Sequence, residues 1–202
     1  MAYNSFQSVE ELQQQFGLVV KSGGSLFMQV GEVPVSAVLQ NMLAENVPLA
    51  LNIHTDKARS EFIIAPVLLE VRRVMERKIS LFSGIEFRVD EARGLSGYCD
   101  FILSNSPDQV FLEVPVVCVV EAKNENIRAG YTQCVAEMLA AQIFNDRKAH
   151  PVSTILGVVT TGSNWKFLTL QGTRVAIDFD EYLISHIEKI LGIFVAVLHS
   201  MT

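Results

Sequence analysis

The run of residues 114–123, VPVVCVVEAK, constrains the fold of this chain more than any other segment. It is almost continuously apolar and rich in valine, whose branched side chain favours strands. A half-buried strand alternates polar and apolar residues, so this run is typical of a central strand that is covered on both faces. Segments of helical period lie before and after it, and helices are the usual cover for such a strand. The run therefore predicts an α/β fold with a mixed central sheet flanked by helices.

The other elements follow from the spacing of apolar residues and from residues that end helices. A capping box that starts at Ser8 predicts a short helix after it. Helical spacing predicts four more helices, over 36–45 with its end at Pro48, over about 55–79 with a kink at Pro66, over 130–145 and over 182–199. Strand patterns predict, besides 114–123, the segments 26–30, 85–92, 97–104, 154–160, 166–170 and 174–177, with a glycine turn at 94–97.

Length and composition limit the class of protein. The 202 residues fit one domain, and a chain that is 50% hydrophobic and 19% charged is not disordered. The opening residues lack a secretory signal, and the longest apolar stretch, 190–198, is shorter than the ~20 residues of a membrane-spanning helix. Three cysteines without a close pair are typical of a reduced protein. We therefore expect a cytoplasmic protein with no membrane partner.

The charge balance limits how the chain could meet nucleic acid. Its formal net charge is −6 at neutral pH. Proteins that coat nucleic acid nonspecifically are basic, because neutralising phosphates supplies most of their affinity. The acidity therefore argues against a histone-like role. It argues less against an enzyme that meets nucleic acid at one cleft, where acidic metal ligands add to the negative count.

The end of the central strand brings charged side chains together. Glu121 and Lys123 are two residues apart, so on a strand they project from the same face. Asp100 interrupts the neutral run GYCDFIL of the preceding strand, and it can lie beside Glu121 if the two strands are neighbours. Two converging carboxylates repel each other unless a cation sits between them, and Mg²⁺ prefers such oxygen ligands. A lysine beside that cation can position a water for hydrolysis of a phosphodiester.

This arrangement resembles the PD-(D/E)XK nuclease superfamily, in which a helix carries a glutamate, a hairpin strand an aspartate, and the next strand Glu-x-Lys. The matching residues here are Glu61, Asp100 and Glu121-Ala122-Lys123, with Gln133 on the following helix; Cys99 stands where the family name has proline. The stretch ARSEFIIAPVLLEV also looks like the first helix of type I restriction subunit nuclease domains. The resemblance covers 57–162 as an αβββαβ core, leaving an N-terminal helical extension, 1–52, and a C-terminal helix, 178–202.

The resemblance implies a restriction-endonuclease-like fold and metal-dependent hydrolysis of phosphodiester bonds, with DNA as the expected substrate. Asp100, Glu121 and the Ala122 carbonyl would hold Mg²⁺, for which Mn²⁺ can substitute. Lys123 would orient and activate the attacking water, while Glu61 would bind a second metal or a metal water. Gln133 would position the site or the phosphate. The candidate phosphate contacts are Lys57, Arg59, Arg88, Arg93, Lys148 and Lys166.

Several alternatives stay open beside this hypothesis. Glu121 and Lys123 could be a solvated ion pair at a strand end, worth well under ~1 kcal/mol. The chain could also be a catalytically silent subunit of this fold that docks a partner, or a different hydrolase. Cys99 is expected to be a buried strand residue rather than a nucleophile.

Two C-terminal features have alternative explanations. The helix at 182–199 is apolar nearly all round, which indicates burial in the core or, second, a homodimer contact. The acidic run 178–181 is expected to lie at the start of that helix, where carboxylates favour the helix dipole, rather than to form a second metal site.

Overall fold

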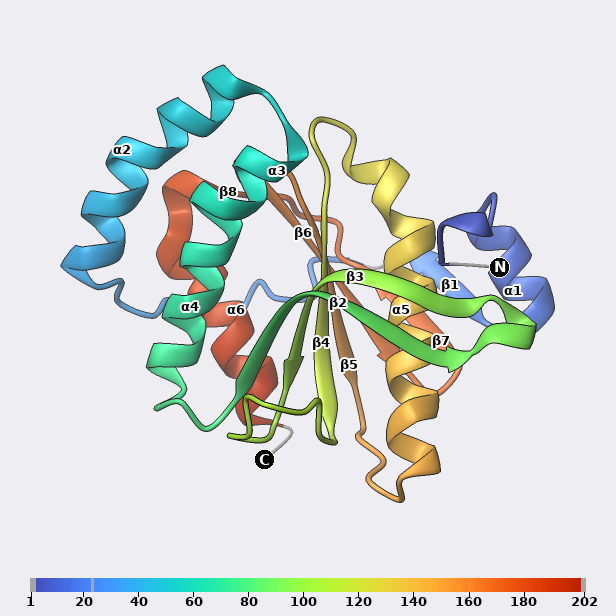
Figure 1. The fold of residues 1–202 in the computed structure, drawn as a ribbon. Coiled ribbons are helices and arrows are strands. Elements are labelled where there is room, and N and C mark those ends of the chain that lie inside the picture. Colours follow the sequence, from blue (N-terminus) through green and yellow to red (C-terminus); the bar gives the residue numbers. More distant parts are fainter. Residues whose placement is uncertain (1–2, 23, 201–202) are drawn as a thin grey trace.

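The computed structural model describes residues 3–22 and 24–200. Within them, one mixed eight-stranded sheet runs in the order β1-β7-β6-β5-β4-β3-β2, with β8 paired to β6 (Figure 1). The strands are β1 (Val19–Ser22), β2 (Ser80–Asp90), β3 (Leu95–Ser104), β4 (Val116–Ala122), β5 (Ile155–Thr160), β6 (Asn164–Gln171), β7 (Arg174–Ile177) and β8 (Tyr182–Leu183). The predicted α/β fold with a mixed sheet between helices is confirmed.

Helices cover both faces of this sheet (Figure 1). One face carries α1 (Val9–Phe16) and the long α5 (Ile127–Arg147), and the other carries α2 (Ala37–Ile53), α4 (Ala65–Val74) and α6 (Ile187–His199). Short helical turns complete the chain: η1 (Tyr3–Ser5), α3 (Asp56–Arg59), η2 (Ser60–Ile64), η3 (Glu91–Arg93) and η4 (Ile184–His186). Every residue of β4 is buried, as expected for a strand covered on both sides.

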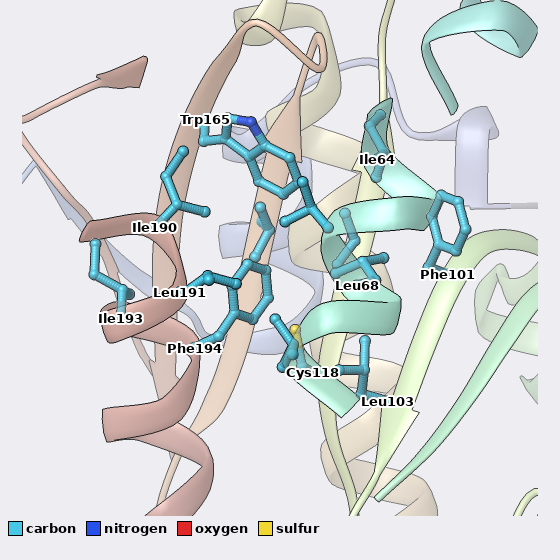
Figure 2. Close-up of a cluster of buried hydrophobic side chains, with 14 of the residues drawn as sticks. Ile64, Leu68, Phe101, Leu103, Cys118, Trp165, Ile190, Leu191, Ile193 and Phe194 are labelled. Atoms are coloured by element: carbon cyan, nitrogen blue, oxygen red, sulfur yellow. The ribbon is translucent and has the colours of Figure 1, made fainter. Parts of the chain in front are cut away.

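The core on the α4 and α6 side explains why α6 is so apolar. Trp165 packs edge to face against Phe194, while Leu68 of α4 and Cys118 of β4 belong to the same cluster (Figure 2). Most apolar side chains of α6 are buried there, leaving Ala196 exposed. Burial in the core, the first explanation of this helix, is confirmed. A homodimer contact through α6 stays a prediction. None of the helices in residues 3–22 and 24–200 is long and apolar enough to cross a membrane.

The prolines act differently from the expectation. Helix α2 continues through Pro48 to Ile53, although the sequence predicted an end at that proline. The carbonyl of Ala44, which Pro48 cannot hydrogen-bond, belongs to an exposed residue and can bind water instead. Where a kink was predicted at Pro66, the structure has a change of helix type: the π-helical turn η2 ends at Ile64, and Pro66 lies in the first turn of α4. The helical segment then ends at Val74 rather than at 79, because Glu76 and Arg77 adopt positive φ angles.

Two segments predicted from local pattern are wrong, and they contact each other. Residues 26–30 form a turn and not a strand. Lys189 of α6 donates to three of their carbonyls and so replaces the N–H donors that a neighbouring strand would supply. The acidic run 178–181 does not start a helix, since α6 begins only at Ile187. The Asp178 carboxylate instead accepts hydrogen bonds from the Leu26 N–H (2.9 Å) and the Tyr182 hydroxyl (2.8 Å).

The hairpin of β2 and β3 is also longer than predicted. Strand β2 starts at Ser80 instead of 85, and β3 starts at Leu95 instead of 97. The turn is made by η3 and Gly94, whose φ of 84° is a conformation that favours glycine. The β1 strand, which pairs in parallel with β7, was missed, because four mostly exposed residues give too short a pattern.

Candidate active site

A polar cavity of about 410 Å³ opens where β3 and β4 approach α3 and η2. Its wall combines carboxylates, two lysines and small residues from four segments of the chain. The lining residues are Asp56, Lys57, Ser60, Glu61, Ser83, Gly84, Asp100, Glu121, Ala122 and Lys123. The strand pairing explains this convergence: Phe101 of β3 lies opposite Val120 of β4, so the next residues outward are Asp100 and Glu121.

Asp100 is fixed to the end of the neighbouring strand. Its Oδ2 accepts the backbone N–H of Ala122 at 2.8 Å, which holds the carboxylate at the cavity wall. Burial raises the pKa of Asp100 above its usual value, while the Ala122 N–H and the Lys123 charge oppose that rise. The predicted neighbourhood of Asp100 and Glu121 is therefore present in the structure.

Glu121 and Lys123 form an ion pair inside the molecule rather than on its surface. Lys123 Nζ donates to Glu121 Oε1, and the side chains of Lys123 and Glu121 are only 24% and 2% exposed. Burial, together with the nearby Asp100 charge, raises the pKa of Glu121 to about 7. Burial alone would lower the pKa of Lys123, but the Glu121 charge and hydrogen bond outweigh it and raise it. The alternative of a solvated pair at a strand end is wrong.

Gln133 reaches this pair from α5, as its predicted place in the site requires. Its Nε2 donates to Glu121 Oε2 at 2.9 Å, and its Oε1 accepts from Lys123 Nζ at 3.4 Å. The same Nε2 donates to Glu137 Oε1 at 3.0 Å. One amide side chain therefore connects a lysine with two carboxyl groups.

Glu137 is the member of this cluster that sequence reasoning missed. It is fully buried on α5, one turn after Gln133, and burial followed by the Glu121 charge raises its pKa well above the usual value. A signal existed, because residues four apart lie on the same helix face. A glutamate in the apolar stretch CVAEMLAA would therefore share the face of Gln133.

Glu61 lies on the cavity wall but is not joined to the buried cluster. It projects from the π-helical turn η2, is 55% exposed and forms an ion pair with Lys57 at 3.0 Å. None of the hydrogen bonds or ion pairs described for the chain connects Glu61 to Asp100, Glu121 or Lys123. Its position is compatible with contact to a substrate or to a water in the cavity.

The candidate phosphate contacts separate into different groups. Arg59 and Lys166 are wrong for that role because both are buried and act within the fold. Arg59 donates to the Asn124 side chain and the Thr161 carbonyl, and Lys166 donates to the Phe179 carbonyl.

Of the remaining candidates, Lys57 alone lines the cavity in the part of the chain that is described. Arg88 pairs with Glu86 and Glu91, Arg93 pairs with Asp90, and Lys148 lies over the Phe144 ring. The six residues therefore do not form one basic surface.

The donor set fits a hard divalent cation better than a transition metal held by a full protein cage. Residues 3–22 and 24–200 contain no cluster of three histidine, cysteine or acidic side chains that could hold a metal. The predicted ligands are two carboxylates, Asp100 and Glu121, with the Ala122 carbonyl. Mg²⁺ commonly uses one or two carboxylates and fills its other positions with water and phosphate. The Asp100 charge helps to raise the pKa of Glu121, so a cation between these two carboxylates would reduce their repulsion.

The three cysteines are not candidates for chemistry. All three are buried and free. Burial raises the pKa of the Cys99 thiol, which agrees with the expected role of a small strand residue.

Comparisons with known proteins do not assign the chain to a family. No protein-family model, curated protein or solved structure matches it.

Proposed function

We propose that this chain is a Mg²⁺-dependent phosphodiesterase that hydrolyses nucleic acid, with DNA as the first substrate to test. The observation that carries the proposal is the convergence of Asp100, Glu121 and Lys123 on one polar cavity. Burying these charged groups costs stability unless they serve a ligand or one another. The proposal extends the resemblance to PD-(D/E)XK nucleases, which motivates the choice of reaction and substrate.

Each residue of the site would have a separate role in this reaction. Asp100, Glu121 and the Ala122 carbonyl would hold Mg²⁺, which when bound stabilises negative charge on a phosphate and acidifies a water. Lys123 carries its proton at neutral pH, since its pKa is raised. Its ammonium would donate a hydrogen bond that orients the attacking water or the phosphate, rather than remove a proton. Gln133 would keep Lys123 and Glu121 in place. Glu61, which also lines the cavity, would contact water or substrate.

A cleavage assay with one matched pair of variants tests this function. The protein is incubated with supercoiled plasmid, single-stranded DNA and RNA, in Mg²⁺, in Mn²⁺ and in chelator. The variants are Lys123→Met and, as control, Lys78→Met, an exposed lysine that pairs with Glu76. We expect cleavage that requires metal, falls at least about 100-fold in Lys123→Met and is unchanged in the control. Equal cleavage by wild type and Lys123→Met, or none by wild type on any substrate, would contradict the proposal.

A docking subunit is the second candidate function, and a different surface favours it. A groove of about 260 Å³ between α2 and α4 is lined by apolar side chains and three arginines. Val38 and Leu69, which line it, are 71% and 57% exposed, and exposed apolar side chains that gather in one groove can mark a binding surface. A folded wild-type protein that cleaves nothing and binds no divalent cation would favour this role over catalysis.

A further inference from the structure

The Glu137 carboxyl group is difficult to explain as a stabilising feature of the fold. Its residue is 0% exposed, and its neighbours on α5, Val135, Ala136 and Met138, are equally buried. Its Oε1 accepts one hydrogen bond, from the Gln133 amide, while its Oε2 accepts none from the described residues. A carboxyl group in such surroundings costs free energy that an apolar side chain of similar size would not. A task in the neighbouring site would account for this cost.

The hydrogen bonds show how Glu137 can reach that site. The Gln133 amide has two N–H groups, and both are used, one on Glu121 Oε2 and one on Glu137 Oε1. Its oxygen is then directed at the Lys123 ammonium. Rotation of the amide by half a turn would point its oxygen at two carboxyl oxygens and its N–H groups at an ammonium. Glu137 therefore adds a second reason for the amide to keep one orientation.

We propose that Glu137 is a positioning residue that acts through Gln133. By fixing the Gln133 amide, it holds Glu121 Oε2 away from the cavity and keeps Glu121 Oε1 and Lys123 Nζ at the cavity wall. Its contribution to metal binding rests on the proposed function, whereas its contribution to the order of the Gln133 amide does not. Groups that orient metal ligands in this way typically change metal affinity 10- to 100-fold when they are removed.

Four variants of the full chain separate this role from a general structural one. Glu137→Met removes the acceptor and fills the same space, so the protein is expected to fold at least as stably as wild type. Glu137→Gln retains an oxygen that can accept from Gln133 Nε2 and is expected to rescue the position. Gln133→Met removes the mediator, and the double variant Gln133→Met/Glu137→Met tests whether Glu137 has any effect without it.

The first readout does not need a metal. Two-dimensional NMR of ¹⁵N-labelled protein follows the side-chain amide signals of Gln133, assigned by their disappearance in Gln133→Met. We expect two resolved, exchange-protected amide protons in wild type and Glu137→Gln. Their protection should fall at least about tenfold in Glu137→Met. Unchanged protection in Glu137→Met, or a loss in Glu137→Gln equal to that in Glu137→Met, would overturn the positioning role.

The second readout is Mn²⁺ binding by calorimetry. We expect Glu137→Met to bind Mn²⁺ about tenfold more weakly than wild type and Glu137→Gln to stay within about threefold. The double variant should bind no more weakly than Gln133→Met alone. A further loss in the double variant would mean that Glu137 acts independently of Gln133 and would overturn the inference. Wild-type protein that binds no Mn²⁺ but shows the expected amide signals would overturn the proposed function and support the positioning role.

Discussion

The link between α5 and the central strand gives the sharpest prediction on stability. Asn145 of α5 is completely buried and hydrogen-bonds both main-chain groups of Val116 at the start of β4. Its Oδ1 accepts the Val116 N–H at 2.8 Å, and its Nδ2 donates to the Val116 carbonyl at 2.7 Å. Asn145→Ala would leave one N–H and one C=O without partners where water has little access. At about 1–3 kcal/mol for each group, we expect a loss of about 3–4 kcal/mol in the free energy of unfolding.

The chain contains a matched control for this loss. Gln109 makes the same pair of hydrogen bonds, to the N–H and carbonyl of Leu81, but on the exposed surface. Because water can replace that side chain, Gln109→Ala should cost less than about 1 kcal/mol. Equilibrium urea unfolding measures both, with the fluorescence of Trp165, the single and buried tryptophan, as the probe. Similar losses in the two variants would refute the reasoning that burial of the unpaired groups sets the cost.

Two further predictions concern packing and pH. Gly192→Ala places a Cβ on the Gly31 carbonyl oxygen and should destabilise the protein by about 2 kcal/mol in urea unfolding. Gly31→Ala, whose Cβ meets no atom within 4 Å, should leave the stability unchanged. Equal effects of the two variants would contradict the close contact of Gly192 with Gly31. The hydrogen bond from Arg73, with one from the Ser36 N–H, lowers the pKa of buried Glu70 from 4.5 to about 2. This stabilisation is complete above pH 4.5 and lost as the pH falls toward 2. Between pH 5 and 2 the free energy of unfolding of wild type should therefore fall by about 2 kcal/mol more than that of Glu70→Gln. Parallel profiles of unfolding free energy against pH for the two proteins would disprove this prediction.

Local periodicity was sufficient to predict the part of the site that lies on strands. The period of two places Glu121 and Lys123 on one face, and the pairing of β3 with β4 then brings Asp100 beside them. The apolar run around them also predicted the covered position of β4 in a mixed sheet. What periodicity could not give was their burial. Only the packing of α5 over β4 shows that Glu121 is enclosed and that Gln133 joins it to Glu137.

Segments whose conformation depends on distant partners could not be predicted in the same way. The turn at 26–30 and the acidic run at 178–181 are joined by the Leu26–Asp178 hydrogen bond, 152 residues apart in the sequence. Arg59 is similar, because its buried guanidinium is explained by Asn124 and Thr161, which lie far along the chain. The sequence around each of these residues gives no sign of its distant partner, so its conformation or burial can be understood only from the tertiary contacts.

A Mn²⁺ titration by calorimetry of wild type, Asp100→Asn and Asp108→Asn tests the central claim most directly, because it requires no knowledge of the substrate. In both variants the asparagine oxygen can still accept the backbone hydrogen bonds that the aspartate accepts, from Ala122 in the cavity and from Val110 in an exposed loop. Only the negative charge is lost. We predict saturable binding by wild type and Asp108→Asn, weakened at least about tenfold in Asp100→Asn. Equal binding by all three proteins, or no binding by wild type up to millimolar Mn²⁺, would contradict a carboxylate metal site at Asp100.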